Sequence, residues 1–236
     1  MFPLKRGWAG IAGKGAGMER FITFEGIEGC GKTTQIRLAE AWFGERNLSV
    51  LATAEPGGTP LGNRIREMLL NRGSLTIGAE AELLLFAAAR AQHVRETILP
   101  ALQAGQWVLC DRFSDATAAY QGFGRGLDIG FIRGLNAFSS PALTPALTFL
   151  FDLPVETGLA RAKKRAAGIR PEAAEDRFER EETAFHMRIR EGYLSLASAE
   201  PERFRVIDGA ADVETVRREV CRHLTALLDK SPAGGN

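Results

Sequence analysis

The chain has 236 residues, of which 45% are hydrophobic and 25% charged, and its formal net charge is +1. These values are typical of a globular protein with a substantial core, and they argue against broad electrostatic binding of nucleic acid. The longest apolar run, Leu83 to Ala89, is too short to cross a membrane. The cysteines Cys30, Cys110 and Cys221 lack metal-binding spacing, which indicates reduced thiols in a cytoplasmic protein.

Short β-prone runs alternate with longer helical patterns along the chain, which predicts βαβ units and a parallel sheet. The expected strands are 21–25, 49–53, 106–110, 146–151 and 204–207. The expected helices are 33–43, 60–70 capped by Thr59, 79–93 with a bend or end near Pro100, a helix capped by Asp128 that runs through Leu135, one opened by Pro154, 179–196 and 212–228. The fold class is therefore α/β: a three-layer P-loop fold with a five-stranded parallel sheet, helices on both faces and ligands at the carboxyl ends of the strands.

The two ends of the chain differ from this pattern. Residues 1–17 are glycine-rich and aperiodic, and Met18 stands directly before the first expected strand, so we expect a disordered extension there. Residues 231–236 form an expected frayed tail. Residues 18–230 are expected to fold as one domain.

A phosphate-binding loop is the most specific feature. Gly26-Ile27-Glu28-Gly29-Cys30-Gly31-Lys32-Thr33 satisfies the pattern G-x-x-x-x-G-K-[ST], with a β-prone run before it and a helical pattern after it. Glycines allow backbone N–H groups to surround an anion, and the helix N-terminus adds partial positive charge. We expect residues Gly26 through Thr34 to bind ATP, with Lys32 at the outer phosphates and Thr33 on Mg²⁺.

Asp111 and Arg112 end another apolar run. An acid at this point of a P-loop protein holds magnesium or its water, and an arginine at a strand end can bridge two phosphates. A surface ion pair is the alternative reading of the two residues taken alone.

Further motifs resemble those of bacterial thymidylate kinases. Residues 111–126 resemble D-R-[YFH]-x-x-S-x-x-A-Y-Q-G with a following G-R-G, and residues 54–59 resemble R-E-P-G-G-T. Residues 84–90 match L-x-F-x-A-x-R, and residues 176–179 match D-R-x-E. Together with the phosphate loop they cover about Arg20 to Leu228 in the family's order. The resemblance implies a kinase that transfers the γ-phosphoryl group of ATP to dTMP, uses Mg²⁺, acts in the cytoplasm as a homodimer, and has no nucleic-acid or membrane partner.

The resemblance also implies roles for individual residues. Phe86 would stack on thymine, Arg90 would donate to a base carbonyl, Thr117 would face the N3 edge, and Tyr120 would occupy the place of a ribose 2′-hydroxyl. Without the family, Phe86 and Tyr120 read as core residues and Arg90 as a solvated charge. The implied dTMP-binding set is Glu28, Glu55, Pro56, Phe86, Arg90, Arg112, Thr117, Tyr120 and Gln121.

Two members of this set carry charge close to the reacting groups. Arg112 would hold the acceptor phosphate. Glu28 is unusual inside a phosphate loop, because its charge opposes that of the ligand, and it would accept a hydrogen bond from the sugar 3′-hydroxyl.

The catalytic cation is expected in a helical lid at about 158–178. One class of these kinases carries an arginine at the position of Gly29, and this chain does not. The densest basic segment contains Arg161, Lys163, Lys164, Arg165, Arg170 and Arg177, and a solvated helix face is its alternative reading. We expect Arg165 to act with Lys32, Asp111 and Arg112 in catalysis.

The chain departs from the family pattern at three places. Ala54 stands where arginine is usual, Ala116 stands where serine is usual, and 166–175 lengthens the lid. A cytidylate or uridylate kinase and a non-catalytic P-loop regulator remain as alternatives. The absence of an N-K-x-D motif disfavours a GTPase.

Overall fold

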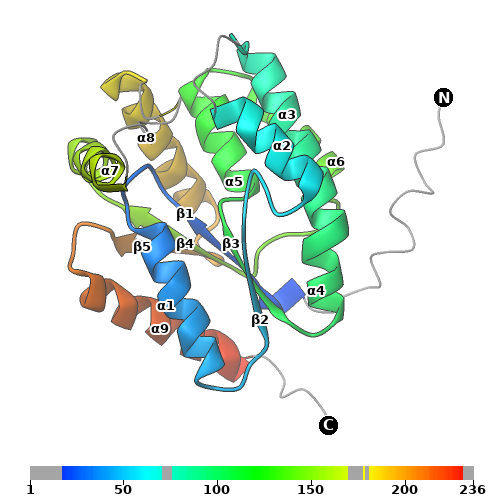
Figure 1. The fold of residues 1–236 in the computed structure, drawn as a ribbon, viewed down its shortest axis with the longest axis vertical. Helices are drawn as coiled ribbons and strands as arrows, with labels where there is room; N and C mark the ends of the chain where they lie inside the picture. Colours follow the sequence, from blue (N-terminus) through cyan, green and yellow to red (C-terminus); the bar gives the residue numbers. More distant parts are fainter. Residues whose placement is uncertain (1–17, 71–75, 170–177, 179–180, 231–236) are drawn as a thin grey trace, which may run out of the picture.

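The computed structural model describes residues 18–70, 76–169, 178 and 181–230. Within these ranges a single parallel sheet runs in the order β2-β3-β1-β4-β5 (Figure 1). The strands are β1 (Phe21–Glu25), β2 (Val50–Ala54), β3 (Trp107–Asp111), β4 (Leu147–Asp152) and β5 (Phe204–Asp208). Each strand lies within one residue of its predicted bounds, and the predicted fold class is confirmed.

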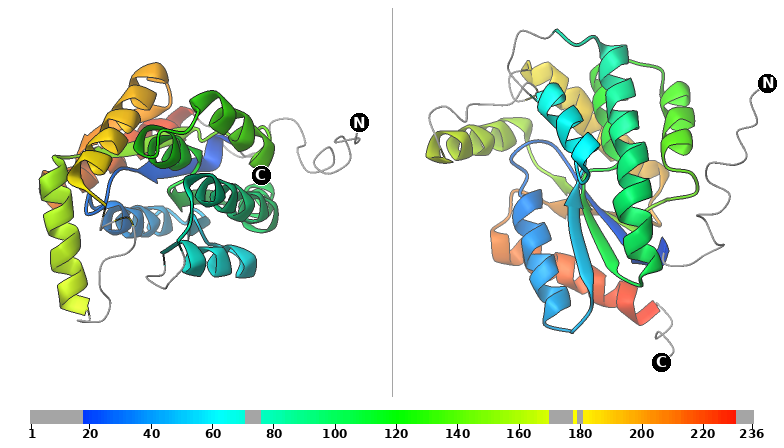
Figure 2. Two further views of the ribbon diagram at one scale, coloured as in Figure 1. Left: turned by 90° about the horizontal axis from the view of Figure 1, so that it is seen from above. Right: turned by 45° about the vertical axis from the view of Figure 1, so that its right-hand side comes forward.

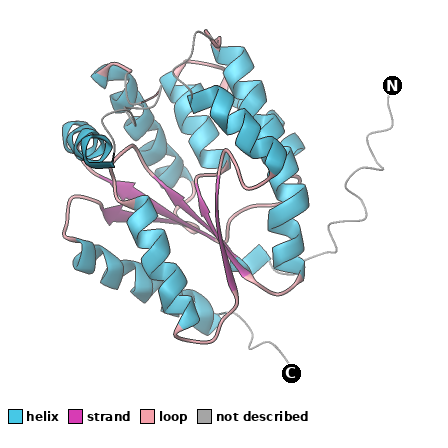
Figure 3. Ribbon diagram, viewed as in Figure 1, coloured by secondary structure: helices cyan, strands magenta, loops and turns pink. Residues whose placement is uncertain are grey.

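Helices cover both faces of this sheet, as Figure 3 shows. They are α1 (Lys32–Gly44), α2 (Pro60–Leu70), α3 (Ala79–His93), α4 (Leu99–Gln103), α5 (Ser114–Thr117), α6 (Ile129–Ser139), α7 (Val155–Ile169), α8 (Thr183–Ala199) and α9 (Val213–Lys230). Helices α1 and α9 pack together on one face, and α8 packs on β4 and β5. Helix α7 extends outward from the body of the domain (Figure 2).

Successive side chains of a strand point to opposite faces of the sheet, and both faces of this sheet are buried. Phe24, Phe149 and Phe151 belong to the core cluster that contains α1 and α9, and the ring of Phe24 lies 5.3 Å from that of Phe149. The neighbouring residues Thr23 and Thr148 share a buried hydrogen bond of 2.8 Å. Because both faces are covered, the strands read as continuous apolar runs rather than as alternating ones.

Side-chain caps hold the starts of three helices, and two of these caps, Thr59 and Asp128, were predicted from the sequence. Thr59 Oγ1 accepts from Gly62 N at 2.9 Å, and Asp128 accepts from Phe131 N at 2.6 Å. Asp212 accepts from Thr215 N at 3.0 Å. Each side chain satisfies a backbone donor that the first helical turn leaves without an internal partner.

Some helical boundaries differ from the prediction. Helix α3 has its predicted bounds, but the helical run continues beyond it. The π-helical turn η2 (Val94–Ile98) joins α3 to α4, in which Pro100 occupies the first turn, and the run ends at Gln103. A further π-helical segment, η3 (Ala118–Gly124), follows α5 where no helix was predicted. Helix α8 begins at Thr183 and not at Glu179.

Several expectations fall on residues outside the described ranges. They concern the extension 1–17, the tail 231–236, the lid residues 170–177 with Arg170 and Arg177, and Glu179 of the D-R-x-E match.

Candidate active site

The phosphate loop joins β1 to α1 at the carboxyl edge of the sheet. Gly26, Gly29 and Gly31 have φ angles of 137°, 69° and 96°, a backbone region that side chains other than glycine rarely adopt. Lys32 is buried in the first turn of α1, and its Nζ donates to the carbonyl oxygens of Gly26 and Ile27, both at 2.9 Å. The sequence therefore folds into a loop that gathers an ammonium group and a helix N-terminus at one point.

Helix α7 contacts this loop without side chains between the two backbones. A Cβ atom added to Gly29 would lie 2.0 Å from the carbonyl oxygen of Gly158 in α7. A Cβ added to Gly158 would lie 2.6 Å from the carbonyl oxygen of Glu28. The close approach explains in physical terms why no arginine occupies position 29: the helix that carries the basic segment fills that space.

Two oxygen-bearing side chains meet beside the loop. The Thr33 hydroxyl donates to Asp111 Oδ2 at 3.3 Å, so the first turn of α1 and the end of β3 bring both groups together. A hydroxyl and a carboxylate are the hard oxygen ligands that suit Mg²⁺, which completes its coordination with substrate phosphates and water. Thr33 and Asp111 therefore fit the role of magnesium ligands.

A cavity of about 170 Å³ opens next to these groups. Its walls contain fourteen of the residues predicted from the sequence: Glu28, Gly29, Lys32, Thr33, Glu55, Pro56, Phe86, Arg90, Asp111, Arg112, Thr117, Tyr120, Gln121 and Arg165. The predicted loop residues that lie outside these walls are Gly26, Ile27, Cys30, Gly31 and Thr34. The cavity thus joins the phosphate loop to the predicted acceptor residues.

Glu28 lies at the centre of a charged cluster on the cavity wall. Its Oε1 accepts from Arg112 Nη2 at 3.0 Å and from the hydroxyl of Tyr120, and its Oε2 lies 3.3 Å from Nδ1 of His186. Burial by itself raises the pKa of the Glu28 carboxyl, but His186, Arg112 and the nearby Lys32 together bring the pKa to about 2. Hydrogen bonding and the nearby cations Arg112 and Lys32 therefore stabilise an ionised acid in this phosphate loop.

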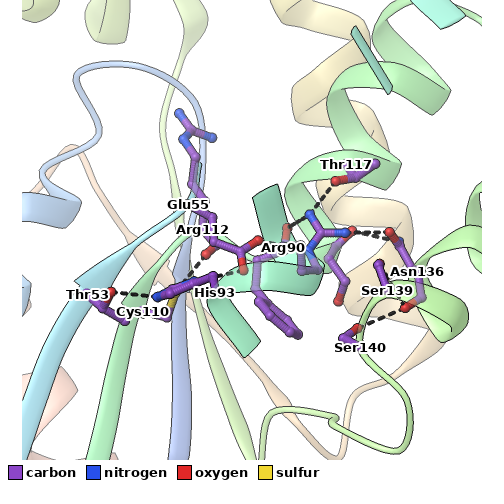
Figure 4. A network of polar contacts seen from close by, with 12 residues as sticks. Thr53, Glu55, Arg90, His93, Cys110, Arg112, Thr117, Asn136, Ser139 and Ser140 are labelled. Carbon is purple, nitrogen blue, oxygen red and sulfur yellow. Dashed lines mark hydrogen bonds and ion pairs between the residues drawn. The ribbon is translucent and has the colours of Figure 1, made fainter. Parts of the chain in front are cut away.

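Arg90 is held in a second polar network, which Figure 4 shows. It is only 1% exposed, and its Nε donates to Glu55 Oε2 at 2.8 Å. Its guanidinium also donates to Asn136 Oδ1, to the carbonyl oxygen of Phe113 and to the Thr117 hydroxyl. Arg90 is thus a fixed buried cation, and the reading as a solvated charge is wrong.

Glu55 supports this network from the end of β2. Its Oε1 lies 3.1 Å from Nδ1 of His93, whose Nε2 bonds the Thr53 hydroxyl at 2.7 Å. Both carboxylate oxygens of Glu55 therefore have protein partners. The geometry makes Glu55 the residue that orients Arg90.

The basic residues of α7 differ in their surroundings. Arg165 lines the cavity. Arg161 instead donates to the carbonyl oxygens of Gly209 at 2.6 Å and Ala210 at 3.1 Å, which ties α7 to the loop after β5. Only Arg165 of these two arginines is therefore placed to contact a bound nucleotide.

Sequence reasoning assigned no role to several residues that shape the site. Phe178 lines the cavity, and its ring centroid lies 6.2 Å from that of Phe86 and 5.6 Å from that of Tyr120. Arg66 lines the cavity from α2 and donates to the Pro56 carbonyl at 2.9 Å. The D-R-x-E match was a signal for Phe178, whereas a single arginine on an amphipathic helix gives none.

Two buried glutamates predict opposite dependences of stability on pH. The pKa of Glu28 in the folded protein is about 2, against an ordinary value of 4.5. Ionised Glu28 therefore stabilises the folded state above pH 4.5, and this contribution is lost as the pH falls toward 2. Burial, with Asp115 nearby, raises the pKa of Glu25 to about 7 against the opposing influence of Arg112, Tyr193 and the Phe113 amide. Its stabilisation is present below pH 4.5 and is lost as the pH rises through 7.

Each effect corresponds to about 3 kcal/mol in the free energy of unfolding. Urea unfolding at a series of pH values tests this for the wild type, Glu28→Gln and Glu25→Gln. The first variant should lose the acidic dependence and the second the dependence between pH 4.5 and 7. Parallel profiles for all three proteins would contradict the assignments.

No helix in the described part of the chain combines the length and the apolar composition needed to span a membrane.

Comparison with known proteins gives consistent results. A family model described as thymidylate kinase matches residues 24–220. The thymidylate kinase of Syntrophus aciditrophicus (strain SB) is 60% identical over 217 residues, which cover 92% of this chain and 99% of that protein. That of Geobacter sulfurreducens is 52% identical over 215 residues, covering 91% and 99%. The crystal structure of thymidylate kinase from Ehrlichia chaffeensis has a TM-score of 0.68 and 35% identity, covering 87% of this chain and 97% of that chain.

The first strand of the parallel sheet leads into a phosphate loop, and the adjacent strand ends with an acid followed by an arginine. This arrangement defines a P-loop phosphotransferase. The family model and the relative that is 60% identical over 92% of this chain narrow this class to a single family. The chain belongs to the thymidylate kinase family.

Proposed function

We propose that the chain transfers the γ-phosphoryl group of ATP to dTMP and releases dTDP and ADP. The observation that carries this proposal is the shared cavity, in which Lys32 and Thr33 of the phosphate loop stand with Phe86 and Arg90 of α3. A donor phosphate and an acceptor base thus have binding groups in one continuous space. Arg112 lines the same cavity and is suited to the acceptor phosphate.

On the donor side, backbone N–H groups of Gly26 to Thr34 and the α1 N-terminus bind the ATP phosphates. Lys32 offsets their negative charge. Thr33 and Asp111 would hold Mg²⁺, which when bound neutralises charge on the ATP phosphates. The protein contributes positioning and charge stabilisation rather than a covalent step.

On the acceptor side, Phe86 presents a flat ring to thymine, and Phe178 packs beside it. Arg90 is pre-oriented by Glu55 to donate toward the base, next to Thr117 and Gln121. The wall around Tyr120 would exclude a ribose 2′-hydroxyl, and Pro56 completes the acceptor set.

Glu28 completes the acceptor side at the sugar. Its side chain lines the cavity and its pKa of about 2 keeps the carboxylate ionised, which supports its role as acceptor for the sugar 3′-hydroxyl.

Replacing Phe86 with alanine tests the acceptor assignment. The Michaelis constant for dTMP should rise about tenfold or more, on the scale of about 1–3 kcal/mol for stacking on a base, while that for ATP stays nearly constant. Glu80→Ala, an exposed change on the same helix, serves as the control. A rise confined to the ATP constant would move Phe86 out of the acceptor site.

A cytidylate or uridylate kinase and a non-catalytic nucleotide sensor are not favoured. The relatives reported above are named thymidylate kinases, and the catalytic set Lys32, Asp111 and Arg112 is intact.

We also propose a cytoplasmic homodimer formed through α2, α3 and α6. These helices adjoin one another, and α6 exposes Phe131 and Phe138 at 60% and 59%. The neighbouring helices expose Leu61, Met68 and Leu84. Paired aromatic and aliphatic side chains on one helical surface are suited to a self-complementary interface.

Sedimentation tests the dimer. The wild type should have twice the chain mass of 25.6 kDa, and Phe138→Asp should shift the protein toward the single-chain mass. A wild type that sediments as one chain at all concentrations would rule the dimer out.

A further inference from the structure

Arg112 adopts an unusual backbone conformation directly after β3. Its φ angle is 68°, in the left-handed region that residues with a Cβ atom rarely occupy. Two hydrogen bonds hold the chain there: Arg112 N donates to the Phe24 carbonyl at 3.0 Å, and Phe113 N donates to Glu25 Oε1 at 2.7 Å. The end of β1 therefore determines how the chain turns at Arg112.

The side chain of Arg112 is held from three sides. Nη2 donates to Glu28 at 3.0 Å, Nη1 donates to the hydroxyl of Tyr193 at 3.2 Å, and the guanidinium carbon lies 4.7 Å from the centroid of the Tyr120 ring. A guanidinium has five N–H donors. These contacts fix its plane and leave other donors for a ligand.

Tyr193 is itself anchored. It lies on α8, is 1% exposed, and its hydroxyl donates to Glu25 Oε2 at 2.7 Å. Glu25 is fully buried. A continuous chain thus runs from the Arg112 guanidinium through a phenol to a carboxylate, and the same carboxylate also binds the backbone after Arg112.

Neither Glu25 nor Tyr193 belongs to the walls of the cavity, whereas Arg112 does. Their side-chain hydrogen bonds therefore reach the cavity through Arg112 and the backbone that follows it. A buried carboxylate and phenol are costly to desolvate unless they are well paired. Their pairing here is directed at one functional side chain.

We propose that Glu25 and Tyr193 are positioning residues that aim Arg112 at the acceptor phosphate. The inference rests on the proposed function, in which Arg112 binds that phosphate. Removal of the Tyr193 hydroxyl leaves the guanidinium held by Glu28 alone at its Nη atoms, so the phosphate contact weakens while the base contact stays.

Calorimetry with thymidine and with dTMP separates the base contact from the phosphate contact. The ratio of the two dissociation constants, Kd for thymidine divided by Kd for dTMP, measures how much the phosphate contact adds to binding. Tyr193→Phe should lower this ratio about tenfold, the loss of one hydrogen bond to a charged group, with thymidine binding and the Michaelis constant for ATP unchanged. Glu25→Gln should lower it similarly, because its amide nitrogen cannot accept from Tyr193. Thr23→Val is the control. It removes a buried hydroxyl from β1 that bonds Thr148, and it should leave the ratio unaltered.

Arg112→Lys distinguishes the two levels of the proposal. If Arg112→Lys lowers the ratio but Tyr193→Phe and Glu25→Gln do not, the positioning role is wrong and the proposed function stands. If Arg112→Lys leaves the ratio unchanged, the phosphate role of Arg112 itself is wrong. Equal weakening of thymidine and dTMP by Tyr193→Phe would show a purely structural role and overturn the inference. Glu25→Gln decides the matter if Tyr193→Phe does not fold.

Discussion

Replacing Lys32 with alanine should abolish phosphoryl transfer while the fold stays intact. The ammonium group lies inside the phosphate loop, 2.9 Å from two of its carbonyl oxygens, where it can turn to the transferring phosphate. Loss of one such charge-stabilising donor costs roughly 10²–10³ in rate, and loss of a full cation costs more.

Turnover and circular dichroism should be measured together for this variant. Arg37→Ala, an exposed change on the same helix, should keep normal turnover. A folded Lys32→Ala protein with turnover near that of the wild type would disprove the role of the phosphate loop.

Replacing Arg165 with alanine should have the next largest effect. Position 29 offers no room for an arginine beside Gly158, so the transition-state cation has to come from elsewhere, and Arg165 lines the cavity. Turnover should fall by roughly 10³–10⁵, the range of an arginine finger, with little change in substrate binding because the contact forms mainly in the transition state.

Arg161→Ala is the matched comparison on the same helix. Its guanidinium bonds the carbonyl oxygens of Gly209 and Ala210, so this variant should lose stability, by about 1–3 kcal/mol, more than turnover. If Arg165→Ala keeps wild-type turnover, the lid-arginine mechanism is wrong and Arg112 becomes the candidate cation.

The sheet and the phosphate loop could be predicted because their signals are local. Gly26 to Thr34 combines glycine spacing with a strand before it and a helix after it, and each strand is a short apolar run with helical patterns around it. The caps at Thr59 and Asp128 act within three residues. Short-range physics is sufficient for such features.

The environment of Arg90 could not be predicted in the same way. Its partners Glu55 and Asn136 lie 35 and 46 residues away, so only the folded chain shows that this helical arginine is buried and paired. His186 is similar: it is fully buried and faces Glu28, although its sequence position indicates only a lone histidine on a helix.

The segment η3 shows a different limit. Its π-helical turn depends on packing against α8, where a Cβ atom on Gly192 would lie 2.6 Å from the Phe123 ring. Propensity within 118–124 gives no sign of that neighbour. The turn nevertheless carries Tyr120 and Gln121 into the cavity wall, so a functional element was visible as a motif and not as a helix.

The specificity for the acceptor is tested most directly by an ADP-release assay across a panel of nucleoside monophosphates, with ATP as donor. The acceptor wall formed by Phe86, Arg90 and Tyr120 predicts the highest kcat/KM with dTMP, and a much lower value with its ribose analogue, cytidylate and uridylate. Preferred turnover of cytidylate or uridylate, or no ADP release with any acceptor, would contradict the assignment of this chain as a dTMP-phosphorylating enzyme.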